Sequence, residues 1–308
     1  MTGADGFVGA WLVPRLLTGG HRVTAAVRPG ARASPPGAMR TIDLELRDPE
    51  SVTAATTDSY DAVVHLAAVA STADAKRDPS TAWDINAVGT ARLCEALGAR
   101  RTAGVSDPTL LIVSTAEVYG AGLASPDLRR ESDPVAPCSP YAASKCGAEI
   151  AALEVWRRTG LRVVIARPFP HTGRGQDDRF VVPAFARRIA HAKAGRQREV
   201  AVGNLAPVRD FLHVSDVVEA YVNLLEHGEA GEIYNVASGG GTSIREVFEG
   251  LARVLHADVV PRVDPTLARP TDIQHLVGDP QKLHARTGWT ARVALDVVLN
   301  EVVSAQAD

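Results

Sequence analysis

The sequence has few cysteines, no long apolar run and no large charge imbalance. Cys94, Cys138 and Cys146 are its three cysteines. They are odd in number and show no metal-ligand spacing, which favours free thiols in a reducing compartment and no metal site. No apolar stretch reaches membrane-spanning length, and no signal-peptide pattern is visible. The net charge of -3 and the pI near 6.3 give no broad basic field for nucleic acid. We therefore expect a cytoplasmic protein that binds neither nucleic acid nor membranes.

The chain also has almost nothing ahead of its first glycine-rich loop. The run Thr2-Gly3-Ala4-Asp5-Gly6-Phe7-Val8-Gly9 leads into an apolar helix-like stretch. Glycines let a backbone approach a pyrophosphate, and a helix N-terminus offers free amides, so this run predicts a dinucleotide cradle. A helix entry without a ligand is the alternative. Such a loop normally follows a buried strand, yet only Met1 precedes Thr2. We expect that a chain extended upstream would be more stable and bind dinucleotide better.

Tyr141 and Lys145 lie four residues apart at the start of an apolar-patterned helix. That spacing places both side chains on one helix face. A neighbouring cation stabilises a phenolate, so such a tyrosine can exchange a proton with a sugar or ketone oxygen. A surface tyrosine beside a solvated lysine has the same spacing by chance, so the rest of the chain must decide between the two interpretations.

Strand-like and helix-like segments alternate up to Tyr141, which predicts a parallel α/β sheet. Arg28 ends the strand expected at 23–28. An acidic residue there would bind the ribose of NAD, whereas arginine accommodates the 2′-phosphate of NADP. NADP is therefore favoured, with NAD as the alternative. Glu45 and Leu46 end the next strand, around 39–46, as an adenine-edge site, and His65 near the end of the strand at 61–68 is expected to be structural.

The ordered motifs resemble those of the extended short-chain dehydrogenase/reductases, the family of nucleotide-sugar epimerases, dehydratases and reductases. The resemblance covers essentially the whole length: glycine loop 3–9, 65–68, Asn86 with Gly89-Thr90, 114–120, and Tyr141 with Lys145. It implies that Tyr141 is the general acid/base, that Lys145 lowers its pKa and that Thr115 bonds the reacting oxygen. The cofactor-binding residues that it implies are Gly3, Asp5, Gly6, Phe7, Val8, Gly9, Arg28, Glu45, Leu46, Leu66, Ala67, Ala68, Asn86, Val113, Tyr141, Lys145 and Arg167.

Motifs in the second half are similar to those of enzymes that act on GDP-6-deoxy-4-keto-hexoses. They are Arg167-Pro168-Phe169, the run 208–217 and Arg269-Pro270-Thr271-Asp272. Arginine is suited to clamp a diphosphate because guanidinium offers bidentate donors; a surface or interdomain ion pair is the alternative. Pro170 stands where the family pattern has an asparagine, and proline has no amide or N–H to offer. The substrate-binding residues that the resemblance implies are Thr115, Glu117, Tyr141, His171, Val182, Arg209 and Arg269.

Reductase and dehydratase are distinguished at Ala116 and Glu117. A dehydratase must remove a C5 proton and expel the 6-hydroxyl, and its glutamate acts beside a serine or aspartate. Alanine has no proton to give. The sequence therefore favours NADPH-dependent reduction of the C4 ketone of a GDP-4-keto-6-deoxyhexose, with Glu117 catalytic or only positioning the substrate. The alternatives are GDP-mannose dehydration, nucleotide-sugar 4-epimerisation, and a non-catalytic nucleotide-binding regulatory protein.

The expected architecture is α/β: a Rossmann-type doubly wound parallel sheet with a smaller C-terminal substrate domain. The dinucleotide-binding domain would span 1–166, with segments of about 205–239 returning to it. Residues 167–308 would mainly form the substrate domain, with the site between the two. By resemblance, the Ala- and Leu-rich helices that carry Asn86 and Tyr141 would pair across a homodimer.

Overall fold

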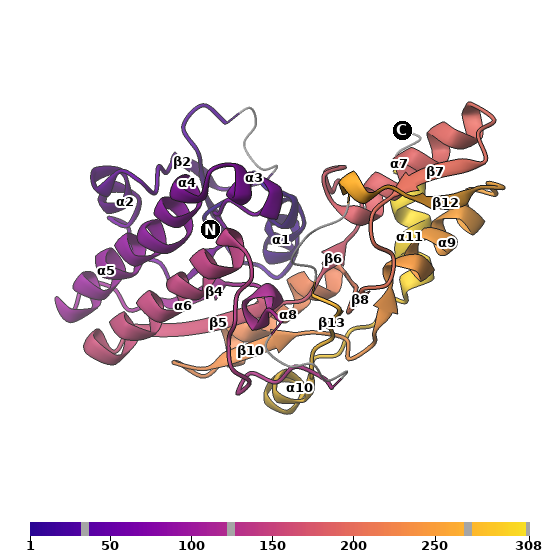
Figure 1. The fold of residues 1–308 in the computed structure, drawn as a ribbon. Coiled ribbons are helices and arrows are strands. Elements are labelled where there is room, and N and C mark those ends of the chain that lie inside the picture. Colours follow the sequence, from indigo (N-terminus) through magenta and orange to yellow (C-terminus); the bar gives the residue numbers. More distant parts are fainter. Residues whose placement is uncertain (32–36, 122–126, 268–272, 306–308) are drawn as a thin grey trace.

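A computed structural model describes residues 1–31, 37–121, 127–267 and 273–305. Figure 1 shows a larger lobe built mostly from the first half of the chain and a smaller lobe that carries α7, α9 and α11. Several short strands connect the two lobes. The predicted α/β, Rossmann-type fold is confirmed by this arrangement and by the relatives described below.

The larger lobe contains parallel strands whose side chains alternate between two faces. Leu111 on β4 packs on one side, while Leu110 and Ile112 pack on the other, as the period of two in a strand requires. Strand β1 pairs with β2, and four further strands pair in the order β10-β5-β4-β3. The strand bounds are β1 Thr24–Val27, β2 Arg40–Asp43, β3 Ala62–His65, β4 Thr109–Val113, β5 Arg162–Pro168 and β10 Ile233–Val236.

Helices cover both faces of these strands. The face that carries Leu111 packs against α1 (Phe7–Thr18) and α8 (Val214–His227). The other face packs against α2 (Pro49–Ala55), α5 (Gly89–Thr102) and α6 (Pro140–Thr159). Because both faces are covered, the central strands β4 and β5 contain nearly continuous apolar runs, which is the usual composition of a parallel sheet.

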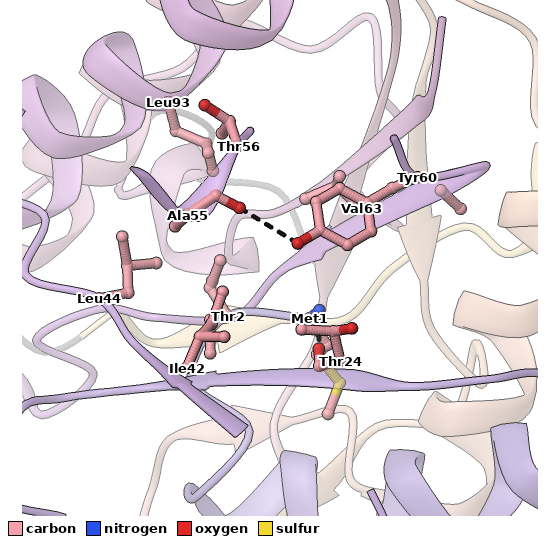
Figure 2. A pocket seen from close by; sticks show the side chains of 12 residues that line it. Met1, Thr2, Thr24, Ile42, Leu44, Ala55, Thr56, Tyr60, Val63 and Leu93 are labelled. Atoms are coloured by element: carbon pink, nitrogen blue, oxygen red, sulfur yellow. Dashed lines mark hydrogen bonds between the residues drawn. The ribbon is translucent and has the colours of Figure 1, made fainter. Parts of the chain in front are cut away.

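Met1 and Thr2 occupy the central place between β1 and β3. The Met1 ammonium group donates to Thr24 O at 2.8 Å, Ala26 N donates to Met1 O at 2.8 Å, and Thr2 N donates to Val64 O at 2.9 Å. Beside them a cavity of about 30 Å³ opens between the strands (Figure 2). Two residues therefore hold the position of the central strand. The cavity is lined by Met1, Thr2, Thr24, Ala26, Ile42, Leu44, Ala55, Thr56, Tyr60, Ala62, Val63 and Leu93.

Two helices depart from regular geometry. Helix α1 continues through Pro14, although a proline inside a helix removes one backbone hydrogen bond. Pro14 and Ala10 are both exposed, so water can solvate the Ala10 carbonyl that the missing N–H leaves free. The single helix expected over 81–97 is instead α4 (Pro79–Trp83), a π-helical turn over Asp84–Val88, and α5. Such π-turns are frequent at functional sites.

The smaller lobe has its own apolar core, which includes Phe185 and Phe248. Its main elements are α7 (Val181–Ala194), α9 (Ile244–Val254), α11 (Leu295–Ser304), β7 (Glu199–Val202) and β12 (Val260–Val263). Short pairs join the lobes: β6 (His171–Thr172) with β9 (Leu212–His213), and β8 (Val208–Arg209) with β11 (Thr242–Ser243) and β13 (His275–Leu276). The remaining short elements are α3 (Thr72–Arg77), η2 (Ala116–Tyr119) and η3 (Pro265–Leu267).

Helix α10 belongs to the larger lobe. It spans Gln281–Thr287 and packs against β10 and α8. Leu283 and Trp289 are buried in the same apolar core as Leu111. The sequence-based boundaries place this segment in the range 167–308, expected to form mainly the substrate domain. In the structure the chain therefore returns to the larger lobe twice, at 214–236 and again at 281–289.

Candidate active site

The glycine loop forms a tight turn between Thr2 and the start of α1. Gly3 has a φ of 63°, and a Cβ there would lie 2.7 Å from Ala67 N. A Cβ on Gly9 would lie 2.4 Å from Ala4 O. Gly6 caps α1 without a side-chain hydrogen bond, so the first amides of the helix are not satisfied by a cap. The loop thus has the tight approach and the free helix N-terminus that a pyrophosphate requires. Asp5 is exposed beside it, and Phe7 and Val8 begin the helix.

An exposed arginine ends β1. Arg28 follows Val27 directly, and its charge acts on Glu45. Arg47 binds the Glu45 carboxylate with both ends of its guanidinium, at 3.0 and 3.1 Å, and together these cations hold the pKa of Glu45 below its usual value. Leu46 is buried and packs against Gly89. Two arginines therefore stand near one carboxylate at this edge, of which the sequence singled out only Arg28.

The segment Leu66-Ala67-Ala68 after β3 is clamped from two sides. Ala67 N donates to Thr2 Oγ1 at 3.2 Å. Asn86 Oδ1 accepts from Val69 N at 2.8 Å, and its Nδ2 donates to Val69 O at 3.2 Å and to Ser144 Oγ at 3.0 Å. The buried Asn86 amide thus links the loop after β3 to α6. Its role in the structure is to shape the site, because its own polar atoms are already engaged.

Tyr141 lies in the first turn of α6, whose N-cap Ser139 accepts from Ala142 N. Thr115 hydrogen-bonds the phenol. Burial raises the pKa of Tyr141, the nearby Glu117 carboxylate raises it further, and the Thr115 hydrogen bond opposes both. At neutral pH the phenol therefore carries its proton, which is the form that a proton donor needs.

Lys145 lies one helical turn beyond Tyr141 and is buried. Its Nζ donates to Val113 O at 2.7 Å, at the end of β4. Burial lowers the pKa of Lys145 to about 8, and Glu149 opposes that decrease. This hydrogen bond fixes the Lys145 ammonium at the end of β4, one helical turn from Tyr141.

Glu117 lies in η2 next to the phenol. Its carboxylate accepts a hydrogen bond from Thr72 Oγ1 of α3, at 3.4 Å. Its amide donates to Thr115 Oγ1, the N-cap of the same turn. Ala116 is buried, with an exposed fraction of 1%, so it presents neither a proton nor surface to a ligand. The structure thus brings Thr115, Glu117, Tyr141 and Lys145 together at one end of β4.

Arg167 is engaged in a buried ion pair. Its Nη2 lies 2.7 Å from Glu149 Oε2, with both side chains 4% exposed. Its guanidinium also lies 4.8 Å from the centre of the Tyr119 ring. The resemblance implied cofactor contact for Arg167, but its hydrogen bonds in this structure go to protein groups. Its buried partner Glu149 was missed, although its position four residues after Lys145 is a signal that the sequence contains.

The residues expected to bind the substrate lie on separate elements, whereas the residues expected to be catalytic gather at one end of β4. His171 stacks on Phe7 at 6.3 Å, and burial lowers its pKa, which keeps the imidazole neutral. The Val182 side chain is buried in the core of the smaller lobe. Arg209 is half-buried on β8, with Nη1 donating to Val208 O. Arg269 lies outside the described residues. Pro170 donates no hydrogen bond, but its carbonyl accepts from Leu212 N at 2.9 Å.

A second pocket, of about 440 Å³, lies in the smaller lobe. It opens between α7, β7 and η3, and arginines and a histidine of α7 contribute to its wall. The sequence did not single out these residues, because they read as the solvated face of an amphipathic helix. The lining is Arg187, Arg188, His191, Ala192, Gln197, Glu199, Val200, Ala201 and Leu267.

Neither a metal site nor a membrane span is found in the part of the chain that the structure describes. No group of three or more His, Cys, Asp and Glu side chains there is placed to hold a metal ion. No helix among the same residues is both long and apolar enough to cross a membrane.

Comparison with known proteins identifies the family. The family model described as GDP-mannose 4,6 dehydratase matches residues 1–302. A GDP-6-deoxy-D-mannose reductase of Pseudomonas aeruginosa is 38% identical over 308 residues, covering 99% of this chain and 95% of the relative. The structure of RMD from Pseudomonas aeruginosa complexed with NADPH has a TM-score of 0.83 and 36% identity, covering 98% of this chain and 96% of that one.

A more distant relative shares the same fold. The Thermus thermophilus UDP-glucose 4-epimerase, in complex with NAD, is 31% identical with a TM-score of 0.85, covering 99% of this chain and 97% of that one. Reductase, dehydratase and epimerase thus share one scaffold, and its loops and site residues distinguish them. By sequence and by fold, this chain belongs to the GDP-mannose 4,6-dehydratase family of NAD(P)-dependent nucleotide-sugar enzymes.

Proposed function

We propose that this protein is an NADPH-dependent reductase that converts the C4 ketone of a GDP-linked 4-keto-6-deoxyhexose to an alcohol. The observation that carries the proposal is the gathering of Thr115, Tyr141 and Lys145 at the end of β4 in a chain that is 38% identical over its length to a GDP-6-deoxy-D-mannose reductase. The buried Ala116 supports reduction over dehydration, because it cannot assist loss of a hydroxyl.

The reaction requires one hydride and one proton. When bound, NADPH supplies the hydride to C4. Tyr141 gives its phenolic proton to the C4 oxygen, and Thr115 orients that oxygen and the phenol. Lys145, as an ammonium, favours the resulting phenolate electrostatically until solvent reprotonates it. The glycine loop and the N-terminus of α1 hold the pyrophosphate, and Arg28 binds the 2′-phosphate.

Tyr141→Phe tests the proton donor. We expect NADPH oxidation with the 4-keto sugar to slow by roughly 10²- to 10⁴-fold, the usual contribution of a positioned acid, while NADPH binding persists. Tyr60→Phe is the matched control, because the Tyr60 hydroxyl donates to Ala55 O and is not one of the groups proposed to react. Full turnover in the Tyr141 variant would show that another group donates the proton.

Dehydration of GDP-mannose is the second candidate. The Glu117 carboxylate supports it, since it lies beside the phenol and is oriented by Thr72. A dehydratase would convert GDP-mannose without net oxidation of added NADPH and would lose that activity in Glu117→Gln. Incubation with GDP-mannose alone and with the 4-keto sugar plus NADPH therefore separates the two activities.

A homodimer through α4, α5 and α6 is part of the proposal. Trp83, Val88 and Ile150 are 43%, 43% and 65% exposed, and the Trp83 ring packs over Gly147 of α6. Such an apolar patch favours burial against a second copy.

Ile150→Asp should give a folded monomer by light scattering, whereas Val260→Asp, at another exposed apolar residue on β12, should leave the dimer intact. A wild-type monomer would contradict this assembly.

A further inference from the structure

Glu149 extends the Tyr141–Lys145 pair by one more helical turn. The three residues are spaced by four along α6, so they lie along one face of the helix. The Glu149 carboxylate is buried and accepts from Ser114 Oγ and from the Arg167 guanidinium, at 2.9 Å to Nε and 2.7 Å to Nη2. A buried carboxylate persists only when it is paired in this way.

Its partners connect it directly to the reacting groups. Ser114 stands between Val113, whose carbonyl accepts from Lys145 Nζ, and Thr115, which bonds the Tyr141 phenol. One carboxylate therefore fastens α6 to the strand end that holds both reacting side chains. Arg167 extends the same link to β5.

Glu149 is also the nearest source of negative charge for Lys145. The other titratable groups around the lysine are His65 on β3, Tyr141 on α6 and Arg167 on β5, and the Met1 amino group lies beyond His65. Burial lowers the pKa of His65 to about 3 and that of the Met1 amino group to about 6, so both are neutral in the working range. Tyr141 is a neutral phenol there, and Glu117 acts on Tyr141. Glu149, whose carboxylate is also paired with the Arg167 guanidinium, is the group whose charge opposes desolvation of the ammonium.

We propose that Glu149 is a positioning residue for the reaction: it anchors the catalytic helix to the ends of β4 and β5 and supplies the buried negative charge that keeps Lys145 an ammonium. The inference deepens the proposed function and rests on it for the importance of that ammonium. Its test requires no sugar and no turnover, so a different substrate would leave the test valid.

The test follows Lys145 by NMR. The chain has four lysines, Lys76, Lys145, Lys193 and Lys282, and Lys145 is the buried one. Its ¹³Cε resonance in ¹³C-lysine-labelled protein is assigned as the signal lost in Lys145→Arg. A pH titration then compares the wild type with Glu149→Gln, which removes the charge but keeps the shape. We expect the Lys145 midpoint to move to lower pH.

Two further variants separate charge from anchoring. Ser114→Ala removes one hydrogen bond and keeps the carboxylate, so the Lys145 midpoint should stay near the wild-type value. The double variant Glu149→Gln with Arg167→Met leaves no unpaired buried guanidinium, so it should recover thermal stability if Glu149→Gln folds poorly. Its Lys145 midpoint should lie below that of Arg167→Met alone, because these two variants differ only in the Glu149 charge.

A Lys145 midpoint in the double variant equal to that of Arg167→Met alone would overturn the proposal, because the Glu149 charge would then have no effect on the lysine. A midpoint shifted equally by Ser114→Ala would overturn it too, since loss of packing would account for the shift. Where turnover is measurable, the basic limb of the kcat/KM profile should move to lower pH in Glu149→Gln and stay in place in Ser114→Ala.

Discussion

Lys145 sets an upper pH limit for the proposed reaction. Burial lowers its pKa from 10.5 to about 8, and the ammonium is the form that assists proton donation. We therefore expect kcat/KM to fall as the pH rises through about 8, and Lys145→Met to be slow at every pH and to lack that limb. A wild-type profile that stays flat well above this pH would contradict the assignment.

The same lysine affects stability with the opposite sign. Its pKa is lowered by folding, so the unfolded chain binds the proton more tightly than the folded chain between the two pKa values. The stability cost of burying the ammonium is therefore fully present below about 8 and decreases as the pH rises toward 10.5. Activity and the lysine contribution to stability thus change in opposite directions over one pH range.

The buried hydroxyl of Tyr221 is not expected to stabilise the folded protein. Its hydroxyl, on α8, has no hydrogen-bond partner among the described residues, whereas Tyr119 donates to Asn235 Oδ1 at 2.6 Å. Tyr221→Phe should leave the free energy of unfolding unchanged or raise it by up to about 1 kcal/mol, while Tyr119→Phe should lower it by about 1–3 kcal/mol. Urea unfolding of both variants checks this; an equal loss would show that the Tyr221 hydroxyl is satisfied in solution.

At the scale of an element, the glycine loop depends on the close approach of backbone to backbone. Gly3→Ala combines a positive φ with a Cβ 2.7 Å from Ala67 N. Gly104→Ala has a similar φ of 70° and no atom within 4 Å, so it isolates the cost of the φ alone. We expect Gly3→Ala to lose roughly 1–3 kcal/mol more stability and to bind NADPH more weakly. Thermal unfolding and NADPH titration measure both effects; equal behaviour would refute the steric argument.

Regular elements were easier to predict than their interruptions. The apolar patterns located the main strands and the helix that carries Tyr141, because runs of apolar residues and their spacing along a helix are local properties of the sequence. The π-turn over 84–88 was not predicted, since it accompanies a clamp that Asn86 makes to Val69 and Ser144. Partners so far away in sequence leave no trace in the periodicity of the helix itself.

At the scale of the whole molecule, the cavity between β1 and β3 limits stability. The Met1 amino group is buried there, and burial lowers its pKa to about 6. An apolar five-residue extension before Met1 would turn the amine into an amide that still bonds Thr24 O and would lengthen the short central strand between β1 and β3, next to the cavity shown in Figure 2. Each side chain newly buried contributes roughly 1.5–3 kcal/mol, so we expect a clearly higher Tm.

A Gly/Ser extension of equal length is the control for this experiment. It removes the buried amine but adds no apolar side chain, so its Tm should fall between the other two. Dinucleotide affinity should follow the same order, because the glycine loop starts at the end of this strand position. Equal Tm values for the two extended chains would show that the apolar side chains of the extension contribute nothing.

The sequence alone determined the parallel α/β class, the glycine loop and the Tyr141–Lys145 spacing, because strand alternation, helix periodicity and turn chemistry are properties of neighbours in the chain. Tertiary structure decided where Lys145 donates, that Arg167 pairs with Glu149, and that α10 returns to the larger lobe. The position of α10 depends on the apolar core that buries Leu283 and Trp289, and the other two outcomes depend on which buried charges can find partners. A long cationic side chain binds the acceptor that folding places within reach, and no local pattern specifies that acceptor.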